Sequence, residues 1–136
     1  QSMGATIHFH GVEQKPGKPM LFATLENRPV FALPGNPRAV MVLYWEYVLP
    51  GLRKMQGATA PWLRSDHVPM DSAVAVKGKR AEFRAVQVVN GKAKLLAEEG
   101  SHMLRTLCIA DALAYLPAEK RAWVAEDTVE VHYLPR

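Results

Sequence analysis

The chain has 136 residues, of which 49% are hydrophobic and 22% charged, and its formal net charge at pH 7 is +4. This length and composition predict one domain or two small ones with a buried core, and the scattered Lys and Arg residues argue against a nucleic-acid-binding protein. No apolar stretch reaches the ~18 residues that a membrane span needs, and no signal-peptide pattern is present, so we expect a cytoplasmic protein.

The first half of the chain reads mainly as strands followed by a helix. Residues 1–3 resemble the remnant of a protease site left by expression and are excluded from the fold argument. Residues 6–12 alternate between apolar and polar side chains, which predicts a half-buried strand. The short apolar runs 20–25 and 29–33 predict two more strands, joined by a tight turn at residues 26–28.

A strand, a turn and a helix start follow one another over residues 31–37. Asn36 is a good N-cap, and Pro37 suits the first helical position because its missing N–H costs nothing there. Such a helix start directs free N–H groups and partial positive charge forward. With Lys15 and Lys18 on the upstream Pro/Gly loop, this predicts an oxyanion or phosphate cradle. The alternative is a plain strand-to-helix connection with solvated lysines, and these residues alone leave both open.

The helix that starts at Pro37 has apolar residues at helical spacing. Pro50 predicts a break, followed by a second helical piece that ends before Gly57. Residues 57–69 have the composition of a connector, and we place a domain boundary within residues 61–69.

The second half changes to short strands rich in Val, Leu and Ala. Asn90-Gly91 is a strong hairpin signal, and five short strands suggest a small barrel or sandwich. Residues 103–107 suit either a helix or a strand. Cys108, the single cysteine, excludes an intramolecular disulfide, and its apolar neighbours predict a buried thiol. The five strands are expected at residues 72–76, 82–89, 93–97, 109–116 and 128–134.

The sequence assigns no metal-binding or catalytic residue. His8 and His10 would lie on one face of a strand, but no cysteine or third ligand is near them. The acidic residues show no spacing suited to holding a divalent cation.

Ordered motifs along most of the chain resemble the molybdopterin molybdenumtransferases, the MoeA/gephyrin group. The matching segments are residues 15–19 (KPGKP), 33–37 (LPGNP), 48–57 (VLPGLRKMQG), 77–84 (KGKRAEFR), 100–102 (GSH) and 110–117 (ADALAYLP). The resemblance implies an α+β fold. Residues 4–60 would be the C-terminal part of an α/β molybdopterin-binding domain, and residues 65–136 a small all-β barrel domain.

The resemblance also implies a function for the full-length protein. Such an enzyme transfers molybdenum from molybdate to adenylylated molybdopterin, uses magnesium and works as a cytoplasmic homodimer. This chain would be its C-terminal fragment, inactive alone and without a bound cofactor, because the family's glycine-rich loop and metal-binding carboxylates lie upstream. The alternative implied by the gephyrin branch is a scaffold that binds a peptide.

Seven residues match the family's substrate-contacting loops. Arg38 departs from the family pattern, which has small or uncharged residues after the second proline. It could add an anion contact or point to solvent, and we expect it to point to solvent. The implied substrate-binding residues are Lys15, Lys18, Pro34, Gly35, Asn36, Pro37 and Ser101.

Overall fold

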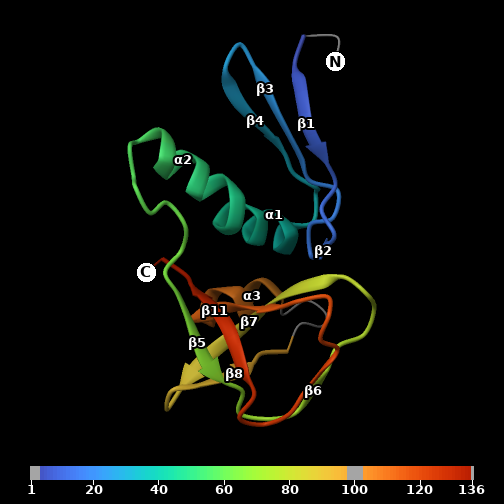
Figure 1. Cartoon of the computed structure of the whole chain (residues 1–136), viewed down its shortest axis with the longest axis vertical. Helices are drawn as coiled ribbons and strands as arrows, with labels where there is room; N and C mark the ends of the chain where they lie inside the picture. The colour runs from blue at the N-terminus through green and yellow to red at the C-terminus, as the bar shows by residue number, and fades with distance from the viewer. Residues whose placement is uncertain (1–3, 98–102, 136) are drawn as a thin grey trace. The chain divides into compact units, whose positions relative to one another are not determined.

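The computed structural model describes residues 4–97 and 103–135, and these form two compact units. The first unit ends at Pro61 and the second begins at Trp62 (Figure 1). Each unit is described separately. The expected protease-site remnant at residues 1–3 and the candidate residue Ser101 lie outside the described residues.

The first unit contains a three-stranded antiparallel sheet in the order β1-β3-β4. The predicted strands and turn are confirmed, but β1 is exposed at all five of its residues, so the prediction of a half-buried strand there is wrong. Glu26 and Asn27 have φ angles of 51° and 63°, as a two-residue hairpin turn requires. The strands of this unit are β1 (Thr6–His10), β2 (Gln14–Lys15), β3 (Leu21–Leu25) and β4 (Arg28–Ala32).

The predicted break at Pro50 is wrong, because the helical segment runs through it. A π-helical stretch precedes the proline, and the Leu49 N–H donates to the Tyr44 carbonyl five residues back. This wider turn accommodates a residue that has no N–H and would crowd the carbonyl four residues before it. The segment consists of α1 (Pro37–Leu43), η1 (Tyr44–Val48) and α2 (Leu49–Met55).

The helical segment ends at Met55, before Gly57 as expected. The Gly57 N–H donates to the Lys54 carbonyl at 3.0 Å, and the Ala58 N–H donates to the Arg53 carbonyl at 3.0 Å. This is the Schellman pattern, which needs a left-handed residue, and Gly57 has a φ of +90°.

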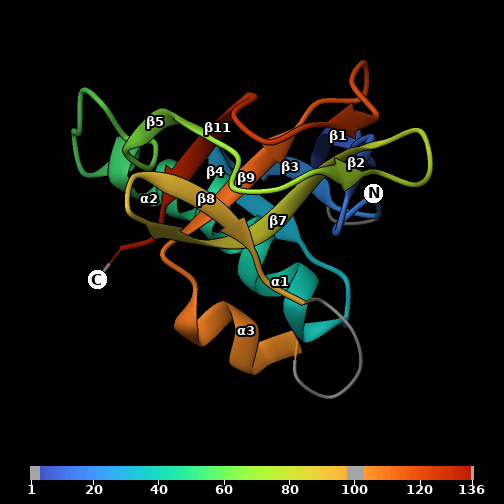
Figure 2. The same ribbon diagram turned by 90° about the horizontal axis from the view of Figure 1, so that it is seen from below.

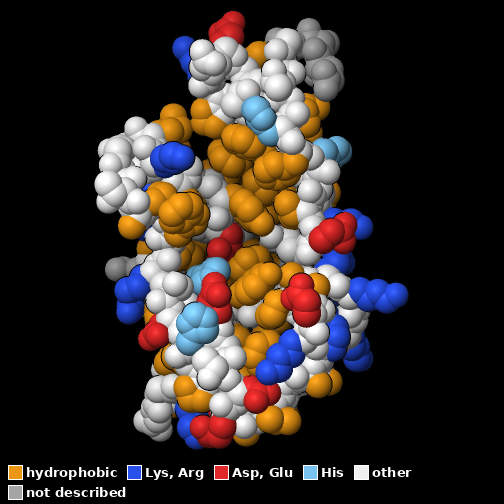
Figure 3. All heavy atoms as spheres, viewed as in Figure 1, with side chains coloured by type: hydrophobic (Ala, Val, Ile, Leu, Met, Phe, Trp, Pro, Cys, Tyr) orange, Lys and Arg blue, Asp and Glu red, His pale blue; other side chains and the backbone are white. Residues whose placement is uncertain are grey.

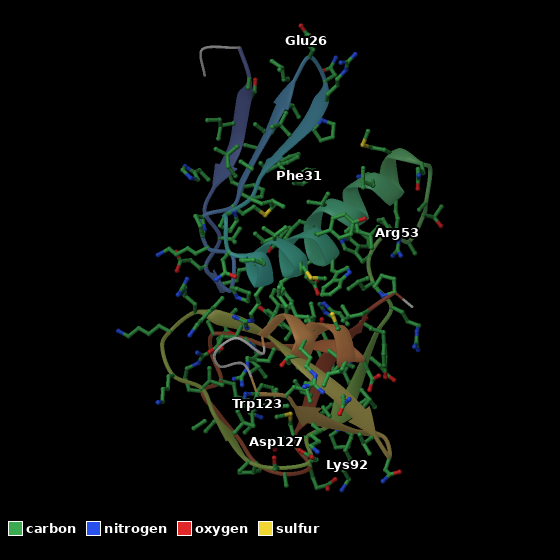
Figure 4. The ribbon with its side chains drawn as sticks, turned by 180° about the vertical axis from the view of Figure 1, so that it is seen from behind. Glu26, Phe31, Arg53, Lys92, Trp123 and Asp127 are labelled. Carbon is green, nitrogen blue, oxygen red and sulfur yellow. The ribbon has the colours of Figure 1, made fainter. Side chains whose placement is uncertain are left out.

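The sheet of the first unit packs against the helical segment. Figure 4 shows Phe31 of β4 beside this segment, and a Cβ added to Gly51 of α2 would lie 3.3 Å from the Phe31 ring. The Phe31 and Phe22 rings are 5.1 Å apart. Hydrophobic side chains also reach the surface of this unit (Figure 3), and Ile7 and Val30 are each 39% exposed.

The second unit is a curled antiparallel sheet in the order β8-β7-β9-β11-β5 (Figure 2). β6 and β10 form a separate antiparallel pair. The predicted hairpin at Asn90-Gly91 is confirmed, since both residues have positive φ between β7 and β8. The elements are β5 (Ser65–Pro69), β6 (Val74–Ala75), β7 (Ala81–Val89), β8 (Lys92–Leu95), α3 (Met103–Ile109), β9 (Ala112–Leu116), β10 (Ala122–Trp123) and β11 (Thr128–Tyr133).

The two edges of this sheet approach each other without forming a ladder. Met70, directly after β5, makes a single parallel bridge with Ala93 of β8, and the Asp71 N–H donates to the Ala93 carbonyl at 3.0 Å. The described strands therefore form a curled sheet that is not a closed barrel, and α3 adds a helix to a unit predicted to be all-β. The α+β class is confirmed. The core inside the curl contains Val68, Met70, Val76, Val86, Ala93, Ala112, Ala114, Leu116, Trp123, Val129 and Val131.

Two local predictions in the second unit are wrong. The predicted connector contains β5, whose residues 65–67 are exposed and lack an apolar alternation. Cys108 is exposed rather than buried, because its segment is the helix α3. On that helix Leu107 is only 2% exposed, and the next residue faces a different direction.

The turn before β11 is held by the carboxylate of Asp127, which accepts a hydrogen bond from the Val124 N–H at 2.9 Å. The Lys120 ammonium lies 3.1 Å from the same carboxylate. The Val124 hydrogen bond and then Lys120 lower the pKa of Asp127 from its ordinary 3.8. Ionised Asp127 therefore stabilises the fold above its unfolded pKa, and this contribution disappears as the pH falls through the lowered folded pKa.

We expect Asp127→Asn to lower the urea midpoint of unfolding at pH 7, because the amide keeps an acceptor for Val124 but loses the charge. The difference from the unmodified chain should shrink as the pH falls through the lowered folded pKa of Asp127, because the carboxyl then loses its charge in the folded state as well. Glu119→Gln, a change at an exposed neighbour, is the matched control. An equal difference at pH 7 and at a pH below the folded pKa would contradict the assigned role of the charge.

Candidate anion-binding site

The lysine loop (residues 15–19) is fastened at its base by backbone hydrogen bonds. The Gly11 N–H donates to the Met20 carbonyl at 2.7 Å, and the Val12 N–H donates to the Lys18 carbonyl at 2.8 Å. Met20 is fully buried. The connection between β1 and β3 is thus a loop closed at its base by hydrogen bonds, and it carries both candidate lysines.

A buried glutamine joins this loop to the helical segment. Gln14 is 4% exposed, its Nε2 donates to the Pro16 carbonyl at 2.9 Å, and its Oε1 accepts a hydrogen bond from the Tyr47 hydroxyl. Satisfying both ends of a buried amide fixes the position of the loop on η1. Gln14 and Tyr47 were not predicted to have this role, since neither residue lies in a local motif that signals it.

The loop backbone also lies directly against α1. A Cβ added to Gly17 would lie 2.7 Å from Leu43 Cδ2, and Gly17 has a φ of +104°. Both the contact and the backbone conformation require glycine here. Leu43 and Tyr47 lie one helical turn apart, so the two anchors of the lysine loop use the same side of the helical segment.

Both candidate lysines are exposed on this anchored loop. The Lys18 side chain is 55% exposed, and its Nζ lies 3.8 Å from Glu13 Oε1, whose side chain is 78% exposed. Such a solvated pair contributes little energy and is easily exchanged for another anion. Lys15 and Lys18 therefore remain available to a negatively charged ligand.

The Pro-Gly-Asn-Pro turn (residues 34–37) starts α1 as predicted, and Asn36 is its N-cap. Asn36 Oδ1 accepts hydrogen bonds from the Arg38 N–H at 2.9 Å and the Ala39 N–H at 3.3 Å. The Val40 N–H donates to the Asn36 carbonyl at 3.0 Å. The expectation of free amides at Arg38 and Ala39 is therefore wrong, because the Asn36 side chain satisfies both.

Arg38 is buried rather than solvent-directed, with 8% of its surface exposed. It lies in the first turn of α1, beside Ala39 on the buried side of the helix. The expectation that the Arg38 side chain points to solvent is therefore wrong, because the residue packs on the buried side of α1.

The structure brings the lysine loop onto the same helical segment that the turn begins. The contacts are at Leu43 and Tyr47, and Leu43 lies six residues, or about 9 Å along the axis, from Pro37. The loop thus rests beside the helix, behind its first turn. Convergence of the Lys15 and Lys18 ammonium groups with residues 34–37 on one ligand stays a prediction, as does the role of Ser101.

Within the described ranges, no three His, Cys, Asp or Glu side chains gather in a way that could hold a metal ion. His8 instead lies at a register shift of β1. Its ring stacks on Phe22 at 5.3 Å, and its Nε2 lies 2.9 Å from Thr24 Oγ1. Among the described helices, none is long and apolar enough to cross a membrane.

Two family descriptions match successive parts of the chain. Residues 1–54 match the probable molybdopterin binding domain, and residues 67–134 match the MoeA C-terminal region, domain IV. The chain belongs to the MoeA family.

Proteins similar to this chain are considerably longer than it. It is 37% identical to a molybdopterin molybdenumtransferase from a Nostoc species over 131 residues, covering 85% of this chain and 29% of that protein. It is 32% identical to the Drosophila melanogaster molybdenum cofactor synthesis protein cinnamon over 122 residues, covering 82% of this chain and 20% of that protein. The crystal structure of a Pyrococcus molybdopterin biosynthesis MoeA protein shares the fold, with a TM-score of 0.80 and 24% identity. The match covers 96% of this chain and 32% of that protein. This MoeA-family chain thus spans less than a third of each of these relatives.

We expect Gly17→Ala to destabilise the first unit by about 2–4 kcal/mol, because the new methyl group overlaps Leu43 and the positive φ becomes strained. Chemical denaturation measures the loss. Gly35→Ala is the matched control, since a Cβ at Gly35 meets nothing within 4 Å. Equal stability of the two variants would contradict the close packing of the lysine loop.

Proposed function

We propose that the protein containing this chain transfers molybdenum from molybdate to adenylylated molybdopterin during molybdenum cofactor biosynthesis. Family membership and the names of the relatives support this activity. The observation that carries the role of this chain is the lysine loop, whose backbone is fixed by Gln14 and Gly17 while its two ammonium groups stay exposed. A fixed pair of cations is suited to an anionic substrate.

Each loop has a separate role in this proposal. Lys15 and Lys18 neutralise the terminal phosphate of the substrate or the molybdate. Pro34, Gly35, Asn36 and Pro37 shape the wall next to them. Asn36 already satisfies the first amides of α1, so the attraction comes from the full charges on Lys15 and Lys18 rather than from free helix amides. Ser101 supplies one hydrogen bond to the same ligand.

The proposed enzyme works as a cytoplasmic homodimer with magnesium. Magnesium prefers carboxylate oxygens in octahedral arrangement, and the described residues do not gather such a set. These residues therefore do not fit the metal, and their contribution is limited to binding and positioning the substrate. We infer that the 136-residue chain alone does not transfer molybdenum.

We expect Lys18→Ala, made in the full-length protein, to weaken binding of adenylylated molybdopterin by roughly tenfold or more, because one charge-assisted contact is lost. The fold should be unaffected, since the Lys18 side chain is 55% exposed. Isothermal titration measures the affinity, and thermal unfolding measures the stability.

Lys54→Ala, at an exposed lysine at the end of α2, is the control for loss of one positive charge in the same unit. Unchanged affinity in Lys18→Ala together with lost stability would assign Lys18 to the scaffold instead of the site. Molybdenum transfer by the isolated 136 residues would contradict the inference of inactivity.

A further inference from the structure

Two basic clusters that are far apart in the sequence come together in the second unit. The first is the basic loop (residues 77–80), which joins β6 to β7 and projects from this unit (Figure 2). The second is Lys120-Arg121. Arg121 Nη1 donates to the Gly78 carbonyl at 3.2 Å and to the Arg80 carbonyl at 3.1 Å. Its Nη2 donates to the Pro117 carbonyl at 2.7 Å. One guanidinium therefore fixes the backbone of the basic loop.

The hydrogen bonds from Arg121, called here the Arg121 clamp, determine the direction of the Lys79 backbone N–H. The peptide between Gly78 and Lys79 is trans, so its N–H points opposite to its carbonyl. Because the Gly78 carbonyl faces Arg121, the Lys79 N–H faces away from the clamp. Gly78 has a φ of +83° between residues of negative φ, a sign alternation typical of backbone turns that bind anions.

The lysines of the basic loop are available to a ligand. Among the described residues, neither the backbone N–H nor the ammonium group of Lys77 or Lys79 has a hydrogen-bond or ion-pair partner. Three of the four residues 77–80 are basic and none is acidic. Both lysines are exposed.

Lys120, in contrast, is already engaged. Its Nζ lies 3.1 Å from Asp127 Oδ2 and 4.1 Å from the centroid of the Trp123 ring. The second basic cluster thus supplies the clamp through Arg121, while the unpartnered positive charge is on Lys77 and Lys79.

We propose that the basic loop binds a phosphate group or another tetrahedral oxyanion through the Lys79 N–H and the ammonium groups of Lys77 and Lys79. Arg121 is a positioning residue that holds the backbone in its binding conformation. This site uses only residues of the second unit and does not depend on the molybdenum transfer proposed above.

The test is a titration of the ¹⁵N-labelled 136-residue chain with inorganic phosphate, followed by amide resonances. We expect saturable shifts at Gly78 and Lys79, with affinity that falls as salt rises because the attraction is between charges. Lys77→Ala with Lys79→Ala should weaken binding at least tenfold. Lys92→Ala with Lys94→Ala removes the same charge from β8 and should leave the affinity unchanged.

Arg121→Lys tests the positioning role, since it retains the charge but loses the planar fork. We expect several-fold weaker binding and broadened resonances for residues 77–80. Repeating the titration with glycerol phosphate shows whether the site binds the phosphate group alone or a larger phosphorylated compound. Affinity equal to that for inorganic phosphate indicates that only the phosphate group is bound. Tighter binding indicates a phosphorylated compound. Either result supports the proposal. Equal weakening by the two double variants, or phosphate shifts spread over all lysines, would overturn it.

Discussion

The lysine loop can lie against the helical segment only because residue 17 has no side chain. A Cβ there would be 2.7 Å from Leu43, a residue that is itself fully buried. This close approach lets Gln14 reach Tyr47 and bury its amide with both ends satisfied. The exposed positions of Lys15 and Lys18 follow from these contacts, since a loop anchored through its backbone and one glutamine leaves its charged side chains uncommitted.

The start of α1 shows that a helix N-terminus is not by itself an anion-binding site. The Asn36 side chain occupies the position that an anion would take, because its oxygen accepts from the Arg38 and Ala39 amides. An anion replacing that side chain would have to compensate for the lost cap, which stabilises a helix by about 1 kcal/mol. In the proposed site, the attraction for an anion therefore comes from the ionised side chains of Lys15 and Lys18, which are both exposed.

Local chemistry predicted most of the fold, and the failures have physical causes. Positive-φ turns and alternating strands are encoded within a few residues, which is why the hairpins at Glu26-Asn27 and Asn90-Gly91 agree with the structure. The prediction of a helix break at Pro50 failed because the neighbouring π-helical geometry, rather than the proline alone, decides whether a helix continues. The prediction that Cys108 is buried failed because an apolar run has no defined buried side until its secondary structure, and so its period, is known. Gln14 was missed because its partner Tyr47 is 33 residues away.

The two basic loops use one physical arrangement with different anchors. In the first unit a buried amide donates to the Pro16 carbonyl, and in the second a guanidinium donates to the carbonyls of Gly78 and Arg80. In each case a side chain from outside the loop satisfies its carbonyls, and a positive-φ glycine lets the backbone turn. Because the anchors take only carbonyl groups, the lysines on either side of each glycine do not have to hold the loop in place. Restricting the backbone in advance lowers the entropy that a ligand must overcome, so the anchoring contacts, rather than the number of lysines, distinguish these loops from the other basic residues of the chain.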